Sequence, residues 1–222
     1  ILTPFNLLYN ISPEITLKIL FRLKLGYNLN LKDPQTYNEK LQWLKLNYKN
    51  PLYTKLSDKY TVREYVARKC PDILNTLYWN GFDPKQIPWD SLPDKFVIKV
   101  THGSGFNIIC ADKSKLNKKQ VERKLSKWLK TKYLKCYGEW FYGLERPRII
   151  IEEFLDSGEN KTPIDYKILC FDGQPKFIAV HTNRFSNHKK NIYDIGWSLK
   201  KDYRISHETD GVPLDKPKEL NQ

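Results

Sequence analysis

Four short segments of the chain carry residue types and spacings that could bind a ligand. In the first, Lys99 lies on a predicted strand and is followed by His102, Gly103, Ser104 and Gly105. Glycines let backbone N–H groups approach a phosphate without side-chain hindrance, and the lysine adds a positive charge. The spacing matches neither the Walker A motif nor the Rossmann glycine motif. An ordinary hairpin turn with an exposed lysine is therefore an equally good interpretation.

The second segment is an apolar run that ends in two acids. Here Ile149–Ile151 are followed by Glu152 and Glu153, and then by Phe154 and Leu155. Just beyond a buried strand, backbone groups are free to bind the edge of an adenine. Either glutamate could also accept a hydrogen bond from the exocyclic amine. Two solvated carboxylates at the end of a strand are the alternative, and the segment taken alone favours that alternative.

The third and fourth segments lie on and just after a predicted hairpin. Asp165 and Lys167 are two residues apart, so on a strand they lie on the same face. There an acid can bind ribose hydroxyls and a lysine can meet a phosphate, although a surface ion pair explains the same spacing. Arg184 follows the second strand and could bind an anion through two parallel hydrogen bonds. A solvated loop is the alternative for Arg184.

The elements that position these segments begin with helices. Ser12 and Pro13 can start one helix as its cap and first residue, and Gly26 can end it. Apolar residues at helical spacing predict further helices over Thr36–Leu46 and Ser57–Lys69. This part of the chain is therefore predicted to form a helical N-terminal region, residues 1–70.

After residue 70 the pattern changes to short apolar runs bounded by turn residues, which indicates strands. Asp172-Gly173 between two such runs is a strong hairpin signal. Helices followed by antiparallel strands, with one long helix between the strands, indicate an α+β fold. We expect one subdomain over 71–145 and a second over 146–222. The predicted strands are Phe96–Val100, Phe106–Cys110, Arg148–Leu155, Tyr166–Phe171, Pro175–Val180 and, more weakly, Ile192–Leu199.

The net charge of +13 has two interpretations. It could attract nucleic acid or a membrane surface, or it could reflect solvated helix faces together with a site for an anionic ligand. Much of the excess lies between Lys113 and Lys135, where Val121 and Leu125 belong to the buried stripe of a helix capped by Asn117. This pattern favours the solvated face. The sequence contains no zinc-finger, homeodomain or RNP-type motif, so we expect no nucleic-acid partner.

Other features narrow the class of protein. The uncharged opening run, residues 1–13, is too short to span a bilayer and lacks the basic start of a signal peptide, so no transmembrane segment is expected. The four cysteines and four histidines are scattered. This predicts free thiols in a reducing cytoplasm and argues against a His-rich metal site. The chain contains no methionine, so we expect a fragment of a longer protein.

The order of these segments resembles the ATP-grasp fold, and most closely its TupA-like family, of the teichuronopeptide-biosynthesis type. A lysine and a glycine loop come first, then an apolar strand with two glutamates, then an acid on a strand before a hairpin. The resemblance covers roughly residues 27–200. It is carried by Asn38–Lys45, Asp58–Val66, Phe96–Gly105, Arg148–Leu155, Asp165–Gly173 and Tyr193–Trp197.

The resemblance implies a nucleotide-binding role for each of the first three segments. ATP would lie between two α+β subdomains. Lys99 would contact its phosphates, and the loop His102–Gly105 would cover them. Glu152–Leu155 would form the hinge that binds adenine, and Asp165 would bind the ribose.

The resemblance also implies a reaction. ATP-grasp enzymes usually activate a carboxylate as an acyl phosphate, which an amine then attacks. Lys167 and Arg184 are the candidate catalytic residues, since they could hold a phosphate or the acceptor carboxylate, and Lys59 would lie near the nucleotide. The TupA-like family is associated with bacterial cell-wall and capsule polysaccharide loci. The implied partners are ATP and an anionic polysaccharide or amino-acid acceptor, in the bacterial cytoplasm, with peripheral association with polysaccharide machinery.

One part of the family pattern is not found in the sequence. Relatives continue with strands whose acidic residues hold Mg²⁺ between the nucleotide phosphates, and no matching pair precedes Gln222. We therefore expect the Mg²⁺ ligands to lie in a missing C-terminal part, so that this chain binds nucleotide and could still be inactive. A glycosyltransferase of a polysaccharide locus is the first alternative, although no D-x-D motif occurs. A basic nucleic-acid-binding module is the second.

Overall fold

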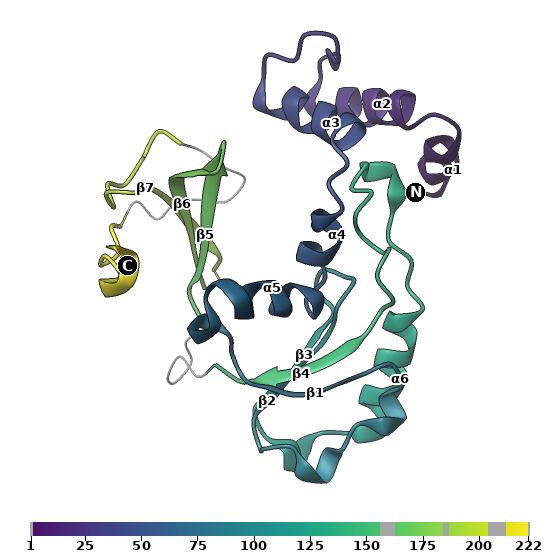
Figure 1. The fold of residues 1–222 in the computed structure, drawn as a ribbon, viewed down its shortest axis with the longest axis vertical. Coiled ribbons are helices and arrows are strands. Elements are labelled where there is room, and N and C mark those ends of the chain that lie inside the picture. Colours follow the sequence, from purple (N-terminus) through teal and green to yellow (C-terminus); the bar gives the residue numbers. More distant parts are fainter. Residues whose placement is uncertain (1, 156–162, 184–186, 204–211, 222) are drawn as a thin grey trace. The chain divides into compact units, whose positions relative to one another are not determined.

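The computed structural model describes residues 2–155, 163–183, 187–203 and 212–221, and Figure 1 labels its helices and strands. The chain forms two compact units, Ile1–Phe154 and Leu155–Gln222. The expected subdomain boundary at residue 146 differs from this division, because the strand that follows it pairs with strands of the first unit. Within the described part of the chain, no helix is long and apolar enough to cross a membrane. All four cysteines are free, as expected.

Helices form the start of the first unit, as the sequence predicts. The helix expected over Ser57–Lys69 begins at Thr61 instead, so its predicted start is wrong and its predicted end is confirmed. The Asp58 carboxylate accepts hydrogen bonds from the N–H groups of Tyr60 (2.9 Å) and Thr61 (3.0 Å) and so begins a new helix. The helices of this region are α1 (Thr3–Ile11), α2 (Pro13–Leu25), α3 (Tyr37–Asn47), α4 (Leu52–Ser57) and α5 (Thr61–Lys69).

Capping side chains define the ends of α2 and α3. Ser12 Oγ accepts a hydrogen bond from the Ile15 N–H at 3.3 Å and starts α2. Gly26 ends that helix in a left-handed conformation, with φ of 81°, which confirms the predicted end. Thr36 and Glu39 form a capping box at the start of α3, and the Glu39 carboxylate is buried there. Local sequence signals therefore decide where these helices begin and end.

The first unit contains an antiparallel sheet with one apolar and one polar face. Alternate residues of its central strands enter a core that the basic helix α6 (Lys118–Leu129) covers with Val121 and Leu125. Asn117 caps α6 through its side-chain oxygen, which confirms the predicted amphipathic helix. The opposite face carries Lys99 and Glu152. The strands are β1 (Leu77–Gly81), β2 (Phe96–Val100), β3 (Asn107–Cys110) and β4 (Ile149–Glu153), in the order β1-β4-β2-β3.

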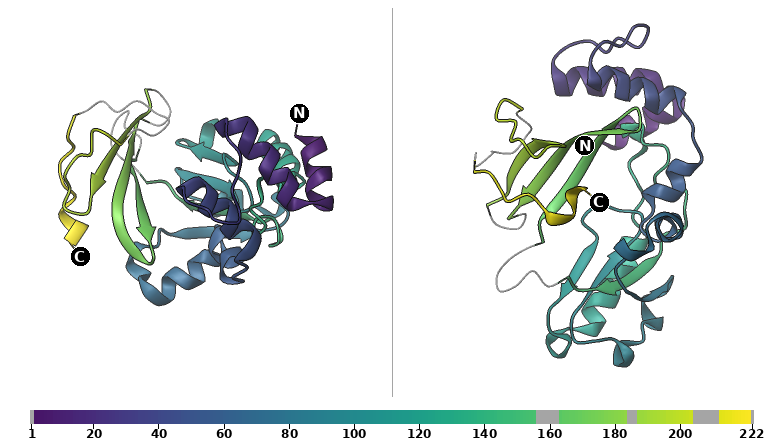
Figure 2. Two further views of the ribbon diagram at one scale, coloured as in Figure 1. Left: turned by 90° about the horizontal axis from the view of Figure 1, so that it is seen from above. Right: turned by 60° about the vertical axis from the view of Figure 1, so that its left-hand side comes forward.

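The second unit is an antiparallel sheet of β5 (Asp165–Phe171), β6 (Gln174–Thr182) and β7 (Lys189–Asp194) in sequential order. Figure 2 shows its long β5–β6 hairpin, drawn in green, from two further sides. Asp172 and Gly173 turn with positive φ values of 51° and 72°, which confirms the predicted hairpin. The strand expected over Ile192–Leu199 begins and ends earlier, because a turn after Asp194 reverses the chain and leaves Leu199 as an isolated bridge.

The faces of the second sheet also differ. One face packs Ile178, Val180 and Tyr193 against apolar residues that follow β7, including Trp197 and Leu214. The other face carries the charged residues at the start of β5. The described residues thus form helices and two antiparallel sheets, which is the expected α+β class.

Candidate functional site

Lys99 and Glu152 form an ion pair on the face of the first sheet that α6 does not cover. Lys99 lies opposite Ile150 on β4, two residues before Glu152, so the register places both side chains on one face. Lys99 Nζ is 2.6 Å from Glu152 Oε2. The Glu152 side chain is 7% exposed and that of Lys99 is 33% exposed. The carboxylate is therefore buried, while the ammonium group still reaches solvent.

Arg63 on α5 is the third charged member of this group. It donates a hydrogen bond from Nη1 to Glu152 Oε1 at 3.1 Å, and its guanidinium also binds the side chain and backbone oxygens of Asn75. Each oxygen of Glu152 thus has its own cation, and the three groups together carry one positive charge. The motifs in the sequence did not single out Arg63. Its spacing of four residues from Lys59 is the signal that could have done so.

Glu152 and Glu153 each have protein partners in the described structure. Both carboxylate oxygens of Glu152 are bound to Lys99 and Arg63. Glu153 exchanges hydrogen bonds with the backbone of Thr76. Its side chain is therefore used to hold the chain before β1. A hinge at Glu152–Leu155 stays a prediction, and in the described structure any adenine contact there would fall to the backbone near Phe154 and Leu155.

The loop His102–Gly105 follows β2 and presents unused backbone donors. Within the described residues, none of its four backbone N–H groups donates a hydrogen bond. Gly105 has a φ of 77°, which L-residues rarely adopt. At Gly103, an added Cβ would lie 2.2 Å from Cδ2 of Phe106, whose ring stacks on Trp128. The loop therefore needs glycine at these positions, and its free donors suit an anion.

Lys59 lies behind this loop and fixes its direction. Its Nζ donates hydrogen bonds to the carbonyl oxygens of Thr101 (3.1 Å) and Gly103 (2.6 Å). In a trans peptide the C=O and the next N–H point in opposite directions. The N–H groups of His102 and Ser104 therefore point away from Lys59. Burial lowers the pKa of Lys59, Asp58 opposes that effect, and the charge of Lys99 adds to it.

His102 anchors the loop to the chain that follows α6. Its Nε2 is 2.8 Å from the carbonyl oxygen of Thr131. Since a carbonyl oxygen only accepts, Nε2 carries a proton. Nδ1 is buried and has no partner within the described residues. A cavity of about 10 Å³, roughly the space of one water molecule, is lined by His102, Asp58 and Gly143. His102 is thus placed as a support for the loop rather than as a side chain directed at solvent.

In the second unit, Asp165 and Lys167 lie on one face of β5, as predicted. Lys167 Nζ is 2.7 Å from Asp165 Oδ2, which is the ion pair that the sequence offered as the alternative interpretation. Asp165 lies opposite His181 on β6, and His181 lies opposite Lys190 on β7. The three side chains therefore form one row across the sheet. Arg184 lies outside the described residues.

His181 was not among the candidate site residues, yet it is the buried member of this row, at 6% exposure. Its Nδ1 is 2.9 Å from Nε2 of His188, so two histidines that the sequence shows as scattered come together as a pair. Nε2 of His181 is buried without a partner within the described part of the chain. Burial and the nearby Lys190 lower the pKa of His181 to about 4, while Asp165 opposes this shift.

The charged groups do not assemble a metal centre in the part of the chain that the structure describes. No three His, Cys, Asp or Glu side chains come together there in a way that could hold a metal ion. Glu152 and Asp165 are each bound to lysine or arginine instead, as the Lys99–Glu152 and Lys167–Asp165 pairs show.

Comparison with known proteins gives a family match. The model of a family described as TupA-like ATPgrasp matches residues 39–222. The matched range begins in α3 and includes Lys59, Lys99, the loop His102–Gly105 and both sheets. No curated protein and no solved structure matches the chain.

Proposed function

The chain belongs to the TupA-like ATP-grasp family, and we propose that it is an ATP-dependent ligase that joins a carboxylate to an amine. Membership of this family indicates a ligase-type fold that binds ATP. The observation that carries the proposal is the loop His102–Gly105, whose four N–H groups are unused among the described residues, next to the exposed ammonium of Lys99. Such a combination of backbone donors and a lysine binds phosphate oxygens.

Lys99 is the proposed contact to the ATP phosphates. A lysine ammonium has three N–H donors, and within the described residues Lys99 uses one of them, on Glu152. Two donors are thus left for phosphate oxygens. Glu152 holds the ammonium in place from its buried side, and Arg63 orients Glu152 by binding its second carboxylate oxygen. These two residues are positioning residues, because they would act on the nucleotide through Lys99.

The loop His102–Gly105 is proposed to cover the same phosphates. Lys59 holds the carbonyl groups of Thr101 and Gly103 on the far side, which leaves the opposite N–H groups for the ligand. The backbone after Glu153 would bind the adenine, and Asp165 the ribose. Lys167 and Arg184 are proposed to hold a phosphate or the acceptor carboxylate. These last assignments rest on the family resemblance and not on a contact in the structure.

ATP would supply the phosphoryl group that activates the acceptor. The carboxylate takes the terminal phosphoryl group to give an acyl phosphate and ADP, and the amine then displaces phosphate to form an amide. The role of this chain's described residues is to bind ATP: the Lys99 charge and the loop donors would offset the negative charge of the phosphates. Among the described residues, no three His, Cys, Asp or Glu side chains come together in a way that could hold Mg²⁺.

The setting that we propose is bacterial cell-wall or capsule polysaccharide biosynthesis, in the cytoplasm, with peripheral association with that machinery. The acceptor would be an anionic polysaccharide or an acidic amino acid. The support is the TupA-like family resemblance together with the net charge of +13, which favours an anionic substrate.

A trapping experiment tests the reaction. The chain is incubated with ATP, Mg²⁺, hydroxylamine and a set of carboxylates, including glutamate and glucuronate, and hydroxamate formation is measured. We expect hydroxamate to form with at least one carboxylate, only when ATP is present, because hydroxylamine intercepts an acyl phosphate. Transfer of a sugar from a nucleotide sugar without ATP consumption would contradict the ligase and favour a glycosyltransferase.

A further inference from the structure

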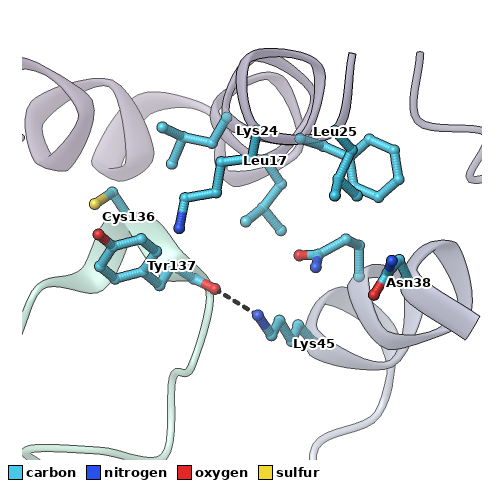
Figure 3. A pocket seen from close by; sticks show the side chains of 10 residues that line it. Leu17, Lys24, Leu25, Asn38, Lys45, Cys136 and Tyr137 are labelled. Atoms are coloured by element: carbon cyan, nitrogen blue, oxygen red, sulfur yellow. Dashed lines mark hydrogen bonds between the residues drawn. The ribbon is translucent and has the colours of Figure 1, made fainter. Parts of the chain in front are cut away.

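A second binding feature lies in the helical part of the first unit, away from the sheet. A cavity of about 220 Å³ opens between α2, α3 and the short 3₁₀ turn Lys135–Tyr137. Figure 3 shows it at close range, with the side chains of α2 above it and those of α3 below and to the right. Leu17, Lys24, Lys45 and Tyr137 are among the residues that line it.

The lining combines an apolar wall with a small cationic group. The wall is the inner face of α2, where Leu17, Leu20 and Phe21 are almost fully buried. Lys24 on α2 itself and Lys45 on α3 bring two positive charges to the same cavity, and none of the described lining residues is acidic. The amides of Asn38 and Gln42 add further donors at its edge. Ligand sites have this composition, with an apolar surface and a few convergent polar groups.

Lys24 and Lys45 both have ammonium N–H donors that make no hydrogen bond within the described residues. Lys45 Nζ donates a hydrogen bond to the carbonyl oxygen of Tyr137 at 3.0 Å, the dashed line in Figure 3. Lys24 Nζ lies 4.8 Å from the centre of the Tyr137 ring and makes no ion pair within the described residues. Burial lowers the pKa of Lys45, Glu139 opposes this, and the charge of Lys24 adds to it. An anion bound between the two lysines would relieve this repulsion.

The cavity is distinct from the proposed ATP site in both position and origin. Six of its ten lining residues, from α2 and the start of α3, precede residue 39, where the family match begins. The Lys99 site lies within the match and on the sheet. Part of the cavity is therefore formed by residues that precede the family match, so the matched range does not form this cavity alone.

We propose that this cavity is an accessory binding site for a small amphipathic anion, with a carboxylate or phosphate head at Lys24 and Lys45 and an apolar body against α2. Lys45 and the two amides would hold the head group by charge-assisted hydrogen bonds. The apolar body would cover the apolar surface that the cavity still exposes to water, which gives a further gain from buried area. Binding there does not depend on turnover of ATP.

Direct binding measurements test this proposal. Hexanoate, hexyl phosphate and the neutral hexanamide are titrated into the full chain and followed by calorimetry or by NMR. We expect at least one of the two anions to bind about tenfold more tightly than hexanamide, since the amide cannot form the charged contacts. The two anions distinguish a carboxylate from a phosphate head group.

Variants locate the site. Lys24→Gln should weaken anion binding about tenfold, because it removes a pocket charge that bears no structural hydrogen bond. Lys18→Gln, six residues earlier on α2 and exposed, is the matched control and should bind normally. Lys99→Ala should also bind normally, which separates this site from the ATP site. Equal binding of hexanamide and the anions, no binding of either anion, or an unchanged affinity in Lys24→Gln would overturn the proposal.

Discussion

The Lys99 ammonium and the Glu152 carboxylate lie 2.6 Å apart on adjacent strands, and the carboxylate is the more deeply buried of the two. Because Arg63 occupies the second oxygen of Glu152, the lysine is held from behind by a carboxylate that is itself fully bound. This arrangement fixes the position of a positive charge at the surface of the sheet, beside the loop His102–Gly105. The proposed binding of ATP depends on this fixed position of the Lys99 charge.

Removing the charge of Glu152 should destabilise the first unit. Glu152→Gln keeps the shape of the side chain but leaves Lys99 and Arg63 as neighbouring cations without their shared carboxylate. We expect a loss of about 2 kcal/mol in the free energy of unfolding, less than the roughly 3–5 kcal/mol for breaking a fully buried pair, because Lys99 is partly exposed. Urea denaturation measures it. Glu153→Gln, which alters a more exposed carboxylate, is the control and should cost clearly less.

Gly103→Ala should distort the loop. The added Cβ would meet the Phe106 ring at 2.2 Å, and that ring stacks on Trp128 with 5.1 Å between centroids, so it cannot move without losing this contact. We expect about 1–3 kcal/mol of destabilisation, as in other overpacked sites, together with weaker ATP binding. Gly173→Ala in the second unit has a positive φ but open space around it, and it should leave ATP binding unchanged. Normal ATP affinity in Gly103→Ala would argue against the loop as a phosphate site.

Lys59 should act as a positioning residue for the same loop. Lys59→Ala removes both hydrogen bonds to the carbonyls of Thr101 and Gly103, so the loop N–H groups lose their fixed direction. We expect about fivefold weaker ATP binding, from the loss of preorganisation, measured by calorimetry. Lys55→Ala, an exposed lysine on α4, is the control and should bind ATP normally. Unchanged ATP affinity in Lys59→Ala would show that the loop is held by other contacts.

The second unit should lose stability as the pH falls. The pKa of folded His181 is lowered to about 4, mainly by burial, from an ordinary value of 6.5. Between these two values the unfolded chain binds more protons at His181 than the folded chain does, so stability rises with pH across this window. The contribution is complete above pH 6.5 and is lost towards pH 4, by up to about 3 kcal/mol.

The variant His181→Gln isolates this effect. Urea midpoints measured at pH 7 and at pH 4.5 should fall less in His181→Gln than in the unmodified chain, because glutamine does not titrate. The same fall in both proteins would place the acid sensitivity elsewhere.

Much of the local structure could be predicted because it depends on residues close in sequence. Ser12, Gly26 and Asn117 end or begin helices through contacts with neighbours three or four residues away, and Asp172-Gly173 makes a hairpin turn. The same holds for Lys99 on its strand and for the Asp165–Lys167 pair. Periodicity and capping rules are sufficient for such features.

The rest of the candidate site depends on contacts between distant residues, which no local pattern contains. Arg63 and Glu152 are 89 residues apart, and Lys59 reaches a loop 44 residues away at Gly103. Because β4 pairs with β1 and β2, it belongs to the first unit, and the two units divide after Phe154 and not at the expected residue 146. The cations that face Glu152 could not be predicted for the same reason: its sequence position shows that it ends a strand but not which side chains lie opposite.

The most direct test of the central claim is the affinity of the full chain for ATP with Mg²⁺, measured by isothermal titration calorimetry for the unmodified chain, Lys99→Ala and Lys115→Ala. Lys115 is an exposed lysine paired with Asp112, and its variant controls for loss of charge alone. We predict that the unmodified chain and Lys115→Ala bind ATP equally, and that Lys99→Ala binds it about tenfold more weakly while remaining folded by circular dichroism. No binding by the unmodified chain, or equal affinity in Lys99→Ala, would contradict the account.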